Sequence, residues 1–136
     1  MCPEIPVDVD SLPTSYTPMD ETLTYEGFIR EATLDTDKNG DSFLAINVEV
    51  TSPPEWRTKR VPDNYIGIPG PVPRDADAGM RRIILERGVK LGRLAAAFKL
   101  PKPLNTETMT GTTGKFTVRN EEYQGDMRPK VGNYVV

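Results

Sequence analysis

The sequence of 136 residues predicts an all-β fold with a single helical segment, on three observations. Apolar and polar residues alternate from Leu44 to Val50, which is the pattern of a strand with one buried face. An Asn39-Gly40 pair precedes this strand, and such pairs tolerate the positive φ angles of a hairpin turn. Thirteen prolines and eleven glycines indicate many turns and loops, as in a small β-protein.

The first predicted hairpin joins a strand over 22–34 to one over 43–50. Leu23, Tyr25 and Ile29 point to the same side of the first strand. The connecting turn, 35–41, matches the start of a calcium-binding EF-hand loop, but Ile46 stands where a bidentate glutamate is needed and the flanks are strands. We therefore interpret 35–41 as a structural hairpin turn without a metal ion.

A third strand is predicted over Trp56–Ile68, interrupted by Pro62 and therefore an edge or bulged strand. The segment 75–99 repeats apolar residues at three- and four-residue spacing, as a helix does, with Asp75 and Asp77 in its first turn. Gly88 is a poor helix former, so we expect a break there and two short helices. Two strands over 114–122 and 127–136 complete the chain, joined around 123–126.

This order of three strands, a helix and two strands is that of a five-stranded Greek-key barrel of the OB type, whose helix lies between strands three and four. The alternative is an open α+β sheet with the helix on one face. Residues 22–136 form the predicted OB domain. Residues 1–21 hold four prolines and five acids without a base, and we interpret them as an extended acidic arm.

Charge is distributed unevenly along the chain, whose net charge is −3. Residues 1–54 carry a net charge of −9, residues 55–102 carry a net charge of +6, and residues 103–136 carry no net charge. Such an asymmetry makes one face attractive to polyanions.

Several classes of function find no support in the sequence. There is no histidine, the commonest general base and transition-metal ligand, so we expect neither catalysis nor a metal or other cofactor. The lone cysteine, Cys2, suits a reducing compartment and forms no intrachain disulfide. No segment is apolar for long enough to span a membrane.

Cationic and aromatic residues cluster on the strands that carry ligands in an OB barrel. Single-stranded nucleic acid requires a cationic groove together with aromatic side chains on which bases stack. Phe43 has the outward parity of its strand, and Trp56 is flanked by charged residues on both sides, with Arg57, Lys59 and Arg60 following it. For each ring, packing in the core is the alternative. The candidate ligands are Phe43, Trp56, Arg57, Lys59, Arg60, Tyr65, Lys115, Arg119, Tyr123, Arg128 and Lys130.

A family resemblance also indicates binding of single-stranded nucleic acid. It rests on Tyr25-Glu26-Gly27-Phe28-Ile29, Lys38-Asn39-Gly40, the strand 43–50, Leu91–Phe98, Gly114–Val118 and Val131–Tyr134. Over about residues 22–136 the chain resembles small bacteriophage OB-fold proteins that bind single-stranded DNA in replication and recombination modules. It departs from single-strand binders with an acidic C-terminal tail, because it ends Asn133-Tyr134-Val135-Val136 and its acidic segment is N-terminal.

The resemblance implies sequence-independent binding of single-stranded DNA, without enzymatic activity, in the cytoplasm of the host cell. Phage replication or recombination proteins are further expected partners, and the sequence leaves a homo-oligomer open. Two other classes remain. One is a protein-interaction module that binds no DNA, such as a phage accessory or virion protein, and the other is an enzyme subunit.

Overall fold

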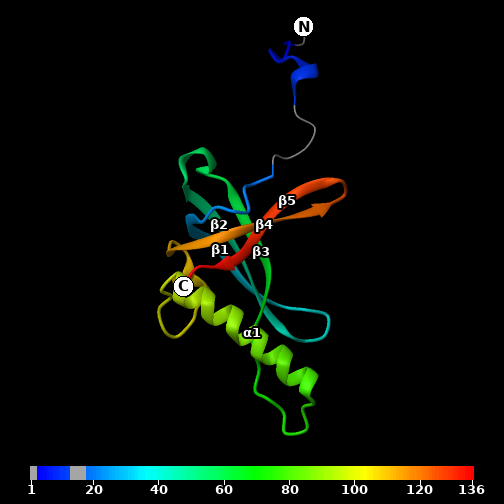
Figure 1. The fold of residues 1–136 in the computed structure, drawn as a ribbon, viewed down its shortest axis with the longest axis vertical. Helices are drawn as coiled ribbons and strands as arrows, with labels where there is room; N and C mark the ends of the chain where they lie inside the picture. The colour runs from blue at the N-terminus through cyan, green and yellow to red at the C-terminus, as the bar shows by residue number, and fades with distance from the viewer. Residues whose placement is uncertain (1–2, 13–17) are drawn as a thin grey trace.

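The computed structural model describes residues 3–12 and 18–136. It is mostly β-structure, a five-stranded antiparallel sheet with the order β3-β2-β1-β4-β5 and one main helix (Figure 1). The elements are η1 (Val9–Ser11), β1 (Tyr25–Thr36), β2 (Ser42–Ser52), η2 (Pro54–Trp56), β3 (Arg60–Gly67), α1 (Ala78–Ala97), α2 (Thr106–Met109), β4 (Thr113–Tyr123) and β5 (Asp126–Tyr134).

The predicted β1–β2 hairpin is confirmed. Leu44, Ile46, Val48 and Val50 are all buried, as their alternation indicates. Gly40 has a φ of 83°, the left-handed conformation that a glycine adopts without strain. The turn and the period-2 pattern thus specify the same register.

β1 pairs with both β2 and β4 around Gly27. Gly27 lies opposite both Val50 of β2 and Gly114 of β4. A Cβ atom at Gly27 would collide with the backbone of Glu49, and one at Gly114 would lie 2.7 Å from the ring of Phe98. The two glycines therefore allow a backbone approach that any side chain would prevent.

The two edge strands of the sheet, β3 and β5, face each other without a backbone ladder. β3 pairs with β2 only and β5 pairs with β4 only, in the part of the chain that the structure describes. The closed barrel predicted from the sequence is therefore not confirmed. Side chains bridge the gap instead, since the hydroxyl of Tyr134 donates to Asp63 across 2.6 Å.

The third strand is shorter than predicted. Trp56, expected to open it, ends the 3-10 helix η2, and β3 begins only at Arg60. The consecutive prolines before Trp56 explain the difference, because proline fixes φ and lacks the N–H that a sheet ladder requires. The expectation that Pro62 marks an edge strand is confirmed by the position of β3 in the sheet.

The predicted break near Gly88 is wrong, because α1 is a single helix of 20 residues. A glycine costs about 1 kcal/mol in a helix, less than the burial of large apolar side chains such as Leu94 stabilises. Asp77 caps the N-terminus by accepting from the backbone N–H of Met80 at 2.8 Å. The short helix α2 was not predicted.

The core lies between the inner face of the sheet and the C-terminal half of α1. Tyr25 and Phe116 stack at its centre with ring centroids 6.1 Å apart. Met19, in the segment predicted as an acidic arm, is also buried, and its backbone is held by the amide of Asn120. Cys2, which we expect to form no intrachain disulfide, lies outside the described residues. Among the described helices, none has the length and apolar character needed to cross a membrane.

Candidate nucleic-acid interface

Two adjoining grooves separate β3 from the β4–β5 hairpin, one of about 510 Å³ and one of about 180 Å³. Both are lined by Pro62, Arg128 and Pro129, and we call the channel that they form the strand groove. Most of the residues that the sequence predicts as nucleic-acid ligands line it, namely Lys59, Arg60, Tyr65, Tyr123, Arg128 and Lys130. The fold thus brings together ligands from two distant segments of the chain.

The β4–β5 hairpin supplies one wall of the strand groove through its register. Arg119 lies opposite Lys130, and Glu121 lies opposite Arg128. Because directly opposite residues share a face of an antiparallel pair, these four side chains project from the same side. Val118, which precedes Arg119 and has the opposite parity, turns toward the core, where it is buried.

An aromatic pair flanks the groove on the other wall. The rings of Phe43 and Tyr65 stack with centroids 4.9 Å apart and an interplanar angle of 24°. Phe43 has the outward parity predicted from sequence and is half-buried, whereas Tyr65 is 41% exposed. Phe43 does not line the groove, and its stacking contact supports the ring of Tyr65.

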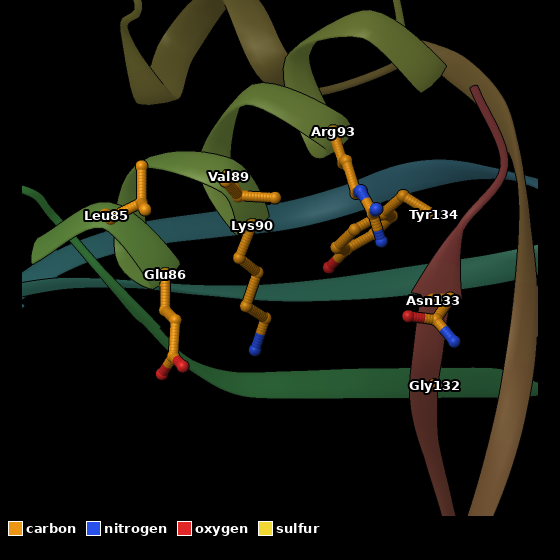
Figure 2. A pocket seen from close by; sticks show the side chains of 8 residues that line it. All are labelled: Leu85, Glu86, Val89, Lys90, Arg93, Gly132, Asn133 and Tyr134. Atoms are coloured by element: carbon orange, nitrogen blue, oxygen red, sulfur yellow. The ribbon is translucent and has the colours of Figure 1, made fainter. Parts of the chain in front are cut away.

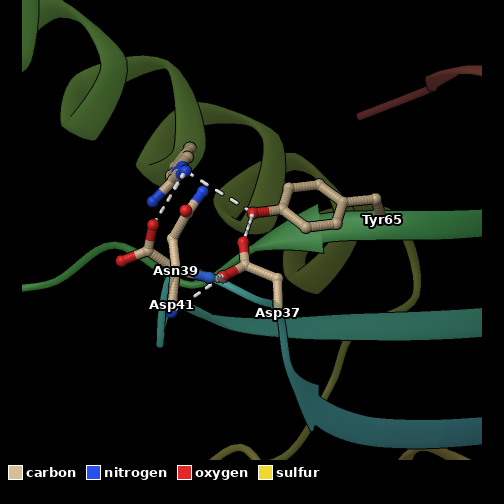
Figure 3. A network of polar contacts seen from close by, with 5 residues as sticks. Asp37, Asn39, Asp41 and Tyr65 are labelled. Carbon is tan, nitrogen blue, oxygen red and sulfur yellow. Dashed lines mark hydrogen bonds and ion pairs between the residues drawn. The ribbon is translucent and has the colours of Figure 1, made fainter.

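A polar network holds the hydroxyl group of Tyr65 at the β1–β2 turn (Figure 3). It donates to Asp37 at 3.1 Å and accepts a long hydrogen bond of 3.5 Å from Arg87. Partial burial, and then the hydrogen bond to Asp37, raise the pKa of Tyr65. Although desolvation opposes it, the backbone N–H groups of Asp41 and Asn39 hold the pKa of Asp37 below its usual value. The acidic turn therefore orients the ring.

A second exposed ring lies across the groove. Tyr123, at the end of β4, is 53% exposed, and the guanidinium of Arg128 lies 4.8 Å from its ring centroid. Such a cation–π contact holds a cation over one face of the ring. Tyr65 and Tyr123 thus offer two aromatic surfaces, one on each wall of the strand groove.

A buried carboxylate forms part of the groove and joins three elements. Asp63 of β3 accepts from the hydroxyl of Tyr134 of β5 at 2.6 Å and from Lys90 of α1 at 3.1 Å. Lys90 also donates to the backbone carbonyl of Tyr65 at 3.1 Å. Burial, and then the negative charge of Asp63, raise the pKa of Tyr134. This cluster connects β3 to β5, between which the described residues form no backbone ladder.

Some of the positive charge of the groove is balanced within the chain. Lys130 pairs with Glu121, and this hydrogen bond lowers the pKa of Glu121. Arg60 is different, because its cross-strand neighbour Glu49 pairs with Arg30 at 2.7 Å. Within the described chain Arg60 makes no ion pair, so its charge is available to a ligand.

The other predicted ligands lie outside the strand groove. Trp56 is half-buried and packs against the core, and Arg57 follows it in the loop before β3. Lys115 lies opposite Glu26, in the part of β4 that pairs with β1. Arg119 shares a face with Lys130 but does not line the groove.

Sequence reasoning missed Lys90 and Asp63. Lys90 belongs to a helix whose cations we interpreted as a solvated face, and no pattern in α1 distinguishes it. Asp63 carries a usable signal, because a carboxylate two residues from buried Val61 lies on the apolar side of its strand. A buried carboxylate requires partners, so the sequence could have predicted a hydroxyl or cation beside it.

The described part of the chain holds no cluster of side chains that would form a metal centre. Among the described residues, no three acidic or cysteine side chains come together as a metal site would require. Comparison with known proteins adds no assignment, since no protein-family model matches the chain and no curated protein matches it either.

Proposed function

We propose that the protein binds single-stranded DNA without sequence preference in the strand groove. The observation that carries this proposal is the groove itself, which is lined by Arg60, Arg128 and Lys130 and by the exposed rings of Tyr65 and Tyr123. This is the combination that single strands require, since cations neutralise phosphates and rings stack on unpaired bases. In a duplex the bases already stack on one another, so a pair of stacking surfaces favours single strands.

The strand order supports an OB-type barrel, which we propose as the fold. The helix α1 lies between β3 and β4 in the chain, and β4 returns to pair with β1. In that arrangement β3 and β5 are neighbours across the opening of the barrel, and ligands bind over strands two and three between the β1–β2 and β4–β5 loops. The strand groove and both exposed tyrosines lie in this region.

Together with the family resemblance, this site suggests a role in phage DNA replication or recombination. A binding protein of this kind holds the single strand without cleaving it, so we propose no enzymatic activity. It would act in the cytoplasm of the host cell, beside the replication or recombination proteins that use the same strand.

The acids of the groove favour a second candidate function. Asp63, Glu121 and Glu122 line the larger groove, so a basic peptide could also be attracted to it. This is the protein-interaction module that binds no DNA. The two candidates differ in one measurement, because only the DNA-binding protein has an affinity for oligonucleotides.

Fluorescence anisotropy with a labelled oligonucleotide, single-stranded against double-stranded, tests the proposal. We expect tighter binding of the single strand, with an affinity that falls as salt rises, by roughly 0.7 in the log–log slope per phosphate contact. Arg60→Gln should reduce the magnitude of that slope by about 0.7. The matched control is Arg74→Gln, which removes an exposed arginine of the loop before α1 and should leave the slope unchanged. An affinity that is the same at low and moderate salt would contradict the proposal.

A further inference from the structure

The solvent-facing side of α1 carries an apolar stripe that nothing in the described chain covers. It consists of Leu85, Val89, Gly92 and Ala96, which we call the outer stripe. Leu85 is 67% exposed and Val89 is 45% exposed. The spacing of four, three and four residues is that of a coiled-coil seam. A helix that presents such a seam to water has the pattern of one that packs against another helix.

The outer stripe is separate from the face by which α1 packs on its own sheet. That face is formed by Leu91, Leu94 and Phe98, of which the last two are buried. The N-terminal half of α1 extends beyond the strands (Figure 1). Since successive helix residues are rotated by about 100°, the outer stripe lies on the side of α1 opposite Leu94 and is open to a partner.

The order of large and small side chains in the stripe selects an antiparallel partner helix of the same sequence. Under a twofold axis midway along the stripe, Leu85 faces Ala96 of the second copy and Val89 faces Gly92 of the second copy. Each large side chain then packs against a small one, as close packing of two helices requires. A parallel pair would place leucine on leucine and glycine on glycine, which leaves a void.

The charges beside the outer stripe show the same complementarity. Glu86 and Arg93 follow Leu85 and Gly92 by one residue, so they flank the stripe on one side. In an antiparallel pair related by a twofold axis, equivalent flanks meet, and Glu86 of each copy faces Arg93 of the other. Figure 2 shows both residues with Leu85 and Val89 along a groove of about 420 Å³ between α1 and the end of β5.

We infer that the occupant of the outer stripe is a second copy of this chain, packed through antiparallel α1 helices in a twofold dimer. A twofold interface uses the same patch on both subunits, and this patch is complementary to itself in both volume and charge. The paired segment spans only about 17 Å at ~1.5 Å per residue, so the dimer should be weak, with dissociation in the micromolar range. The inference does not depend on DNA binding.

Sedimentation velocity of the full-length protein over a range of micromolar concentrations tests this inference. We expect a reversible monomer–dimer equilibrium, weakened at least roughly tenfold by Leu85→Glu, which places two charges in the seam. Leu34→Glu is the matched control, because Leu34 is an equally exposed leucine, at 62%, on β1. Since Leu85 is exposed, its replacement should leave the circular dichroism melting curve unchanged. A protein that stays monomeric at all concentrations, or a dimer insensitive to Leu85→Glu, would overturn the inference.

A charge exchange tests the antiparallel arrangement. Glu86→Arg alone and Arg93→Glu alone each place like charges opposite one another, and each should weaken the dimer. The double variant restores opposite charges and should regain most of the wild-type association. If the double variant associates no better than either single variant, Glu86 and Arg93 do not face each other and the antiparallel arrangement is wrong.

Discussion

Replacing Tyr65 and Tyr123 together by alanine is expected to weaken binding of a single-stranded oligonucleotide by about 2–6 kcal/mol, which is roughly thirtyfold or more. Each ring should contribute about 1–3 kcal/mol by stacking on a base, and the two lie on opposite walls of the strand groove. The measurement is an anisotropy titration at fixed salt. Both rings are substantially exposed, so the free energy of unfolding should change by only about 1 kcal/mol.

Trp56→Ala serves as the control, because we expect it to lower the stability of the fold and to leave DNA binding unchanged. Trp56 is half-buried against the core and does not line the strand groove. Its truncation should lower the free energy of unfolding by about 2–3 kcal/mol, below the range for a fully buried ring, while the folded protein binds DNA normally. If Trp56→Ala abolishes binding in a folded protein and the tyrosine pair does not, the stacking surface lies elsewhere.

Asp63→Ala should produce the largest loss of stability, about 2–4 kcal/mol in the free energy of unfolding. The carboxylate accepts hydrogen bonds from Tyr134 and Lys90, and its removal leaves the buried hydroxyl of Tyr134 without its acceptor. Removing one member of a buried pair costs about 3–5 kcal/mol, and the partial exposure of Lys90 reduces this figure.

Urea denaturation followed by circular dichroism measures this loss. Asp63→Asn keeps an acceptor for Tyr134 and should lose less stability than Asp63→Ala. Glu49→Ala is the control, because it removes a carboxylate whose partner Arg30 is exposed, and such pairs contribute about 0–1 kcal/mol. Equal effects at Asp63 and Glu49 would show that the contact between β3 and β5 contributes little to the fold.

Local patterns in the sequence were sufficient to predict most of the fold. The β1–β2 hairpin is determined by two local signals, the alternation from Leu44 to Val50 and the turn at Asn39-Gly40. Each of these signals depends only on residues that are close together in the sequence. The helix continues through Gly88, where we expect a break, because the packing of Leu94 and Phe98 at the other end of α1 outweighs the low helix propensity of glycine. Trp56 was misplaced because the prolines before it end β2 and form a 3-10 turn.

The candidate site was predictable only in part. Side-chain parity places Arg128 and Lys130 on one face of their hairpin, and this can be derived from sequence. The approach of that hairpin to Tyr65 depends on tertiary contacts such as the bond between Tyr134 and Asp63, which no local pattern specifies. The ion pair of Glu49 with Arg30, which leaves Arg60 without an ion pair among the described residues, likewise depends on the register between strands.

Chemical-shift mapping of the full-length protein with a short oligothymidine tests the central claim most directly. Amide resonances of β3 and of the β4–β5 hairpin should shift on titration, with the largest changes near Tyr65 and Tyr123, while those of the outer stripe stay in place. The shifts should diminish as salt is added, because phosphate contacts compete with counterions. Resonances of the strand groove that stay unchanged at saturating oligonucleotide, or shifts confined to other surfaces, would contradict the assignment of this groove as the DNA-binding site.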